Sequence, residues 1–453
     1  MHYKIKKGLD IMMAGEADHR TEKLPLSRFC YIHPSDFRWW KPKMLVSEGD
    51  EVEIGTPLFC EKGEERVRIV SPVEGRVKEV LRGEKRAIES VVLEVSENAS
   101  LSRMIPFDDA LLSGDECRNL LMQCGLWPCI RQRPFSVVPR PEAHPKAIFV
   151  PCFDSAPLAP DMDLLLGDQL EYMQQGINVL KQVAGEQVPL FLCLEQGGKN
   201  DFFESLDEVD CQYFSGPHPA GNVGTQIHYV APLDTDETVW YIHPLDVARI
   251  GMLFSTHRLS FATTFALTGP GVRHPHYFTT VYGTDLSALL EQEKNAQNVR
   301  CISGNVLTGS KMANHLSLRF YDHQVTLVPE GGEREWMGWL KPGFKKWSFS
   351  HTFMAWMARD RQFSFTTSLQ GGRRNFVMTD VYERVFPFEI LPLELLKACL
   401  IKDLDQMVEL GIFEVDDEDF ALCEVVCPSK MECQKIVRDG LKELYDSTDQ
   451  AVR

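Results

Sequence analysis

The stretch YFSGPHPAGNVGTQIHYVA, residues 213–231, holds three glycines between two apolar runs. Glycines this close together let the backbone take positive φ and let another group approach it closely. A strand that leads into such a loop is where an open α/β sheet usually binds a ligand. The stretch lacks the Lys-Ser/Thr ending of a P-loop and the spacing of a dinucleotide fingerprint. On physical grounds alone, a rigid turn that serves only the fold is the first interpretation.

The sequence around this loop alternates short apolar runs with a helical pattern. Four runs predict strands: AIFVPCF (147–153), VPLFLCL (188–194), CQYF (211–214) and VWYI (239–242). Apolar residues between the first two recur at helical spacing, at Leu170, Met173, Ile177 and Leu180. Strands that alternate with helices predict a parallel sheet with right-handed crossovers. The glycine loop follows the third strand and residues 196–199 follow the second, so both loops lie at the edge where such sheets bind ligands.

The N-terminal part predicts a small all-β module at residues 29–100, with the first 28 residues wrapping onto a later domain. Its short apolar runs are divided by glycine turns, which is typical of short strands. The spacing of Gly49, Asp50, Val52, Gly55 and Leu58 resembles the hammerhead of biotinyl/lipoyl carriers. Lys62 lies near the place of the modified lysine, but it stands in EKG rather than in a carrier context. The interpretation favoured is a borrowed fold without a prosthetic arm.

The remaining sequence completes a multidomain α/β protein. Residues 101–256 form the predicted Rossmann-like domain, and residues 257–330 return to β signals with one helix at 286–295, which suggests a β-grasp-like domain. Residues 331–453 form a helical end, with helices predicted at 393–410 and 431–445 from their apolar faces. Gly411 suits the position that follows a helix.

The composition bounds the function. The chain has 453 residues, 44% hydrophobic and 25% charged, with a net charge of −17, so a nucleic acid partner is not expected. No apolar run approaches the ~20 residues that span a bilayer, and no secretory signal opens the chain, so a cytoplasmic location is expected. Thirteen cysteines form no C-x-x-C pair, which favours reduced, mostly buried thiols over a metal or iron–sulfur site.

The chain shows none of the common catalytic motifs. G-x-G-x-x-G, G-x-S-x-G and H-E-x-x-H are all absent. His218 and His228 flank the glycine loop and could donate a proton to a bound ligand or could simply be structural. Arg373 and Arg374 could hold an anion, although a solvated surface pair is the simpler interpretation.

Nine short segments carry a resemblance to a known family. They are IKKGLDIMMAGE (5–16), MLVSEGDEVEIGTPLF with SPVEGRVKEVLRGEKRAIESVVLEV (44–59 and 71–95), GPHPAGNVGTQIHYVAP (216–232), LTGPGV with RCISGNVLTG (267–272 and 300–309), GWLKPGFKKWS (338–348), YERVFPFEILP (382–392) and DDEDFALCEVVCPSK (416–430). In this order they resemble the NqrA family, the A subunits of the Na+-translocating NADH:quinone reductase. The family also implies that the β-grasp-like domain is of the SLBB type.

The resemblance implies a peripheral subunit on the cytoplasmic face of a bacterial inner membrane. Its expected partners are five other subunits, above all the integral membrane B subunit, with quinone as substrate and Na+ export coupled to quinone reduction. No tightly bound cofactor is expected in this chain, whereas FMN, riboflavin, FAD and iron–sulfur centres are implied for the partners. The isolated chain is expected not to be catalytic. One alternative is a flavin-binding electron-input subunit of the Rnf or complex-I type, which would be yellow. Another is a carrier-domain protein, in which Lys62 would carry an attached group that raises the intact mass.

Two sets of candidate site residues follow. A quinone would bind beside the glycine loop, at Gly216, His218, Gly221, Asn222, Gly224 and Thr225. The aromatic and basic segment 336–356 would dock on the membrane partner through Trp339, Lys345, Lys346 and Trp347, because aromatic residues alternating with lysines suit an apolar centre with an anionic rim. A shorter aromatic group at Phe37, Trp39 and Trp40 is the alternative docking surface, and burial in the core is the competing interpretation for both.

Overall fold

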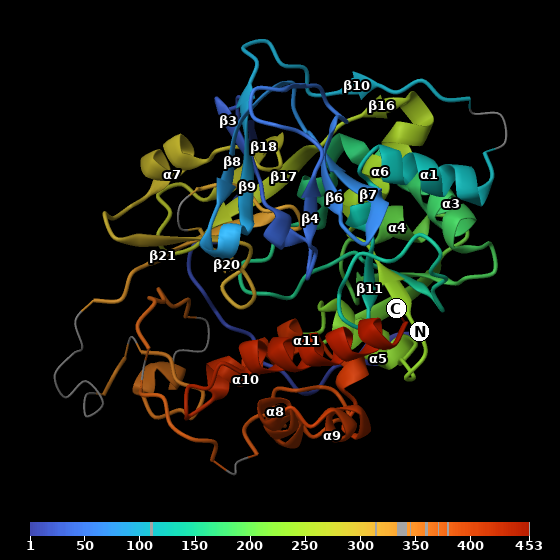
Figure 1. Cartoon of the computed structure of the whole chain (residues 1–453). Helices are drawn as coiled ribbons and strands as arrows, with labels where there is room; N and C mark the ends of the chain where they lie inside the picture. The colour runs from blue at the N-terminus through green and yellow to red at the C-terminus, as the bar shows by residue number, and fades with distance from the viewer. Residues whose placement is uncertain are drawn as a thin grey trace.

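A computed structural model describes residues 1–108, 112–312, 315–332, 342–344, 346–357, 361–369, 371–377 and 380–452 (Figure 1). Besides the elements given below, the described chain has short strands β10 (Arg103–Met104) and β16 (Arg258–Leu259). It also has short helices α2 (Met162–Leu166) and α4 (Asp201–Glu204), and 3-10 turns η1 (Pro34–Asp36), η2 (Glu84–Arg86), η3 (Trp127–Cys129), η4 (Gly167–Tyr172), η5 (Met354–Met357), η6 (Ile412–Glu414) and η7 (Asp417–Phe420).

A six-stranded sheet with the order β1-β14-β13-β12-β15-β11 lies at the centre of the α/β region. The four predicted strands are confirmed as parallel neighbours: β12 (Ile148–Pro151), β13 (Leu190–Glu195), β14 (Asp210–Ser215) and β15 (Val239–Tyr241). β1 (His2–Lys4) adds a parallel edge, and β11 (Arg131–Arg133) an antiparallel one.

The two faces of this sheet are covered by different cores. Ile148 and Val150 pack into the same core as α1 (Gly114–Gln123), α3 (Met173–Ala184) and α6 (Pro244–Thr256), whereas Phe149 packs with residues of α5 (Val223–Val230). This follows from the pleat, because successive side chains of a strand point to opposite faces. The predicted helix at 170–180 is present as a 3-10 turn followed by α3.

The N-terminal module is β-rich as predicted and consists of two small sheets. One contains β3 (Phe29–Ile32), β9 (Ile88–Val95), β8 (Gly75–Arg82) and β5 (Glu51–Val52), and the other β4 (Pro42–Met44), β6 (Pro57–Glu61) and β7 (Glu64–Val70). Lys62 is exposed in the tight turn between β6 and β7.

The third region is a six-stranded sheet with one helix. Its strands are β2 (Asp18–Lys23), β18 (His276–Val281), β17 (Ala262–Thr268), β21 (Gln324–Pro329), β19 (Val299–Ser303) and β20 (Ser310–Lys311), and its helix is α7 (Ser287–Glu293). Because β1 joins the α/β sheet and β2 joins this one, the first residues wrap onto later parts of the chain, as the sequence predicts. The β-grasp assignment and the four domain boundaries stay predictions.

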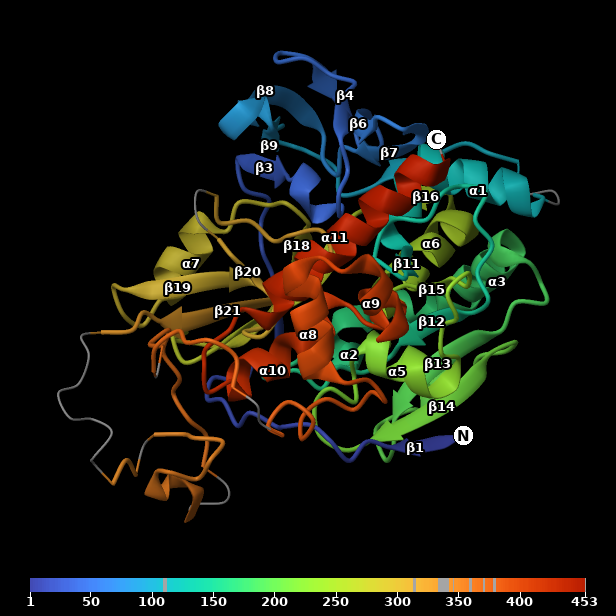
Figure 2. The same ribbon diagram turned by 60° about the horizontal axis from the view of Figure 1, so that its bottom comes forward.

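The C-terminal unit is helical and lies along one side of the molecule (Figures 1 and 2). It contains α8 (Pro392–Ile401), α9 (Leu404–Glu409), α10 (Ala421–Val426) and α11 (Cys433–Val452). The single helix predicted for 393–410 is wrong. Lys402 takes a left-handed conformation (φ 58°) that ends α8, and the Asp403 carboxylate accepts the Gln406 N–H at 3.1 Å to begin α9. Gly411 follows α9 with φ 86°, as predicted.

Candidate functional site

The predicted glycine loop joins β14 to α5 at the carboxyl edge of the parallel sheet. Gly216 has φ 119°, and a Cβ at this position would lie 2.1 Å from the carbonyl oxygen of Ile5. A Cβ at Gly221 would lie 2.4 Å from the backbone nitrogen of Ser155. Both glycines are therefore required by close backbone approach, and the loop lies directly against the turn that follows β12.

His218 is enclosed within this loop. Its side chain is 3% exposed, and its Nδ1 lies 3.0 Å from Ser155 Oγ, which also accepts the Gly221 N–H at 2.8 Å. The backbone N–H of His218 donates to Asp10 at 2.9 Å. Burial lowers the pKa of His218 to about 4, so the imidazole is neutral near pH 7. The other flanking histidine, His228, contacts Glu414 at 2.9 Å and so ties α5 to the C-terminal unit.

The C-terminal unit covers the end of the loop. Gly224, Thr225 and Gln226 are buried, and the Asp419 carboxylate lies against Gly224 at the first turn of α5. Asn222, the residue before α5, is half-buried, and its side chain makes no capping hydrogen bond. Among the described residues, Thr225 Oγ1 and Asp419 Oδ1 have no hydrogen-bond partner. The loop is therefore accessible at Asn222 rather than at Gly224.

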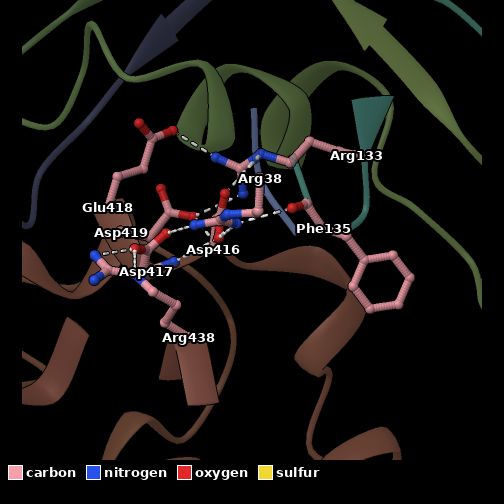
Figure 3. Close-up of polar contacts among 8 residues, drawn as sticks. All are labelled: Arg38, Arg133, Phe135, Asp416, Asp417, Glu418, Asp419 and Arg438. Carbon is pink, nitrogen blue, oxygen red and sulfur yellow. Dashed lines mark hydrogen bonds and ion pairs between the residues drawn. The ribbon is translucent and has the colours of Figure 1, made fainter. Parts of the chain in front are cut away.

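An acidic turn, residues 416–419, joins the C-terminal unit to the N-terminal module and to the α/β region (Figure 3). Arg38 of the N-terminal module bonds Asp416 at 2.5 Å and also contacts Asp417. Arg133 of β11 bonds Glu418 at 2.5 Å and Asp419 at 3.3 Å. These contacts join segments far apart in sequence, so the position of the acidic turn depends on both arginines.

The carboxyl groups of the acidic turn and the two arginines shift one another's pKa values. Burial works to raise the pKa of Asp416, but the Arg38 and Arg133 guanidiniums outweigh it and hold that pKa below its usual value. Burial raises the pKa of Asp419 well above its usual value, although Arg133 opposes the change. Desolvation thus dominates at the carboxylate nearest the glycine loop, and Coulomb attraction dominates at the one nearest Arg38.

A second polar region lies beside the loop, where the strand order of the sheet reverses. Chain order runs outward from β12 to β13 and β14, while β15 pairs on the other side of β12. Such a switch point is where open α/β sheets bind ligands. Asp154 follows β12 and is exposed, and His243 follows β15 and is half-buried. The two strand ends at the switch point therefore carry a carboxyl and an imidazole.

The His243 ring is stacked on His323, with centroids 4.0 Å apart, and Arg131 lies over the Tyr321 ring at 4.4 Å. Burial lowers the pKa of His243 far below its usual value, with His323 and Arg131 adding to the effect. Burial likewise lowers the pKa of His323 to about 3. Among the described residues, His323 Nε2 has no partner. Although Asp154 is exposed, the protein atoms around its carboxyl raise its pKa by desolvation, and Glu418 adds to this increase, so this carboxyl holds a proton more readily than a free aspartate.

Sequence reasoning singled out the glycine loop but not this switch point. His243 directly follows the predicted strand VWYI, which was the available signal. That signal could not be used, because the order of strands in the sheet, and hence the switch point, is not readable from one sequence.

The predicted docking residues are only partly described. Trp339 and Lys345 lie outside the described residues. Trp347 is half-buried, with its ring 6.0 Å from that of Phe365, and the Lys346 ammonium lies 5.6 Å from the Phe353 ring centroid.

The alternative aromatic group belongs to the protein core. Phe37 is 2% exposed, Trp39 packs on Phe135 and Tyr445, and Trp40 packs on Phe37.

The cysteines are unpaired, and all but the half-buried Cys211 are buried, which agrees with the sequence interpretation. Among the described residues, no group of three or more His, Cys, Asp or Glu side chains could hold a metal ion. Within the same residues, no helix is both long and apolar enough to cross a membrane. Arg373 pairs with Glu432 at 2.6 Å on the surface.

Three family models match the chain. They are described as the NqrA N-terminal barrel-sandwich hybrid domain (residues 3–96), the NqrA second alpha/beta domain (112–259) and the NQRA C-terminal domain (264–314). The first match agrees with the predicted carrier-like module.

Similar curated proteins span nearly the whole chain. The A subunit of the Na+-translocating NADH-quinone reductase of Rhodopirellula baltica is 37% identical over 449 residues, which cover 97% of each chain. The protein of the same name from Pseudomonas aeruginosa is 38% identical over 97% of this chain and 99% of its own. Among solved structures, an NAD+-reducing [NiFe]-hydrogenase in the air-oxidized state aligns with 74% of this chain and 61% of its own, at 11% identity and a TM-score of 0.37.

Proposed function

The chain belongs to the NqrA family, and from that premise we propose that it serves as the A subunit of a Na+-translocating NADH-quinone reductase. The observation that carries the proposal is 37–38% identity to proteins of that name, along at least 97% of both chains. The resemblance drawn from the sequence motifs is thereby confirmed. The enzyme is the assembled complex, and this chain contributes to it as a peripheral subunit.

The test is isolation of the tagged chain from detergent-solubilised membranes of its own cells. The expected result is co-purification with NADH-dependent, Na+-stimulated quinone reduction and with further subunits, including an integral membrane protein. A chain that purifies alone, while the membranes retain that activity without it, would overturn the assignment. The cytoplasmic face and the flavin and iron–sulfur content of the partners belong to the same proposal and can be read from the same preparation.

The quinone site is proposed beside the loop 216–225. Its support is the position of the loop at the carboxyl edge of the sheet, next to the switch point. The headgroup approaches at Asn222, because Gly224 and Thr225 are covered by the acidic turn. Reduction of a quinone to a quinol takes up protons, and the exposed Asp154, whose pKa is raised by desolvation, stands next to Gly221 as a proton donor. The buried His218 and Gly221, and the exposed Gly216, whose α-carbon packs against Ile5, shape the loop rather than touch the headgroup.

A photoreactive quinone tests this site in the assembled complex. Label is expected in the peptides that contain Asn222 and Asp154, and Asn222→Ala should reduce it. Asn200→Ala is the matched control, since Asn200 lies after β13 at the same sheet edge. Label found only in other regions or in a different protein of the complex would move the quinone site away from this loop.

Docking on the membrane partner is proposed for the segment around Trp339, Lys345, Lys346 and Trp347. The support is a half-buried Trp347 and a 57% exposed Phe344 beside lysines, on a chain of net charge −17. Charge reversal of both lysines should release the chain from membranes while its circular dichroism spectrum stays unchanged. Retention of the double variant at ordinary salt would count against this surface.

A further inference from the structure

A pocket of about 330 Å³ opens between the C-terminal end of α8 and the N-terminal part of α11. The two helices pack against each other (Figure 2). Its apolar lining comes from Cys399, Leu400, Met431 and Ile436. This volume lies at the small end of the roughly 300–1,000 Å³ of ligand sites. The pocket, called the α8–α11 pocket below, therefore suits one large side chain rather than an extended cofactor.

The rim of the α8–α11 pocket is basic. Four cationic side chains line it, together with the carboxylates of Glu432 and Asp439: Arg373, Lys402, Lys430 and Lys435. The excess of cations is local, because the whole chain carries a net charge of −17. Arg373 was one of the two arginines that the sequence marked as able to hold an anion.

The cations differ in how firmly they are held. Arg373 pairs with Glu432 at 2.6 Å and Lys435 with Asp439 at 2.5 Å, and all four of these side chains are more than half exposed. Exposed ion pairs contribute little to stability, so an incoming carboxylate can replace Glu432 or Asp439 at little cost. Among the described residues, Lys430 forms no ion pair, which leaves its charge ready for an anion from outside.

An apolar ridge borders the pocket. Leu400 is 49% exposed and the neighbouring Ile401 is 70% exposed, where α8 ends. An apolar centre inside a charged rim is the usual anatomy of a protein–protein interface, and its binding energy concentrates in large side chains that fill pockets.

We propose that the α8–α11 pocket docks a segment of a partner protein in the complex, in which a large apolar side chain is flanked by Asp or Glu. This inference rests on the proposed function, since it presupposes that the chain assembles with other subunits. The mixed rim favours a protein over an anionic membrane surface. Glu432 and Asp439 would be repelled by a uniformly negative bilayer, whereas a folded partner can match both signs.

The first experiment places a photoreactive benzophenone amino acid at position 401 of the full chain in the assembled complex. Ile401 is well exposed, so this change leaves the fold intact. Mass spectrometry of the cross-linked product is expected to identify an acidic segment of another protein of the complex. Cross-linking to lipid, to a segment without excess Asp and Glu, or to nothing while the chain remains in the complex would overturn the proposal. A chain absent from the complex would instead overturn the proposed function.

The second experiment measures rebinding of purified variants to membranes stripped of this chain. Lys430→Glu is expected to raise the apparent Kd about tenfold, with the larger loss at low salt. Lys85→Glu is the matched control, because Lys85 is an exposed lysine of the N-terminal module with φ 54°, close to the 53° of Lys430. Ile401→Ser, which removes apolar surface without adding charge, should weaken rebinding to a similar extent at low and high salt. Equal Kd values for Lys430→Glu and Lys85→Glu would overturn the proposal.

Discussion

The Asp419 carboxylate lies against the α-carbon of Gly224: a Cβ on Gly224 would stand 2.4 Å from Oδ1 and 2.7 Å from Oδ2. Gly224 belongs to the first turn of α5, and the first turn of a helix directs unpaired N–H groups outward and favours negative charge. The chain's own carboxylate therefore occupies the place where this loop would offer an anion site. Gly224, which the sequence analysis assigned to a ligand site, instead makes room for Asp419 of the acidic turn.

Replacing this glycine tests the contact. Gly224→Ala is expected to lower the free energy of unfolding by about 1–3 kcal/mol, because the carboxylate must move and its bond to Arg133 must adjust. Urea denaturation measures the change. Gly198→Ala is the control, since a Cβ there meets nothing closer than 3.4 Å. Equal losses in the two variants would show that the contact is not specific.

The arginine that holds the acidic turn gives a larger effect. Arg133 is 1% exposed and bonds Glu418 and Asp419, so Arg133→Met leaves buried carboxylates without their cation. Removal of one partner from a buried ion pair costs about 3–5 kcal/mol. Limited proteolysis should then cut the C-terminal unit first. Arg28→Met is the control, because the 72% exposed Arg28 side chain pairs with Glu94 on the surface, and a loss there as large as that of Arg133→Met would refute the role of the cluster.

Local patterns explain which parts of the fold were predictable. Ile148 and Leu190 lie in short apolar runs that are buried on both faces, which is typical of parallel strands. The amphipathic spacing of Met173, Ile177 and Leu180 was equally direct, and all three are buried. Each of these signals is contained within about a dozen residues, so the sequence alone carries it.

The errors and omissions depend on contacts across long distances or on single backbone angles. The break at Lys402 requires a left-handed conformation that apolar periodicity does not report. Asp419 packs against Gly224, and His243 stacks on His323. Both contacts join residues from different regions of the chain. No spacing rule predicts such pairs, because they follow from how whole units pack.

The isolated chain should be colourless and should not oxidise NADH. The sequence lacks the dinucleotide fingerprint, and Asp419 covers the first turn of α5. Lys62, although exposed at a hairpin turn, should carry no group. Visible absorbance, NADH consumption and intact mass of the purified chain measure these outcomes. Stoichiometric flavin would favour the electron-input alternative, and added mass on Lys62 the carrier alternative.

His218 should make stability depend on pH. Burial lowers its pKa to about 4 in the folded chain, against about 6.5 in an unfolded one. Below about pH 6.5 only the unfolded state gains this proton, so the stabilisation is complete above that pH and is lost as the pH falls toward 4. The loss is about 1.4 kcal/mol per pH unit.

In His218→Asn, whose side-chain oxygen can still meet Ser155, the free energy of unfolding should fall less steeply between about pH 6.5 and 5. The difference between the two proteins isolates His218 from the buried aspartates, which titrate in both. His144→Asn, at an exposed position, should keep the slope of the unmodified chain. If His218→Asn also keeps that slope, the imidazole is not held neutral by burial.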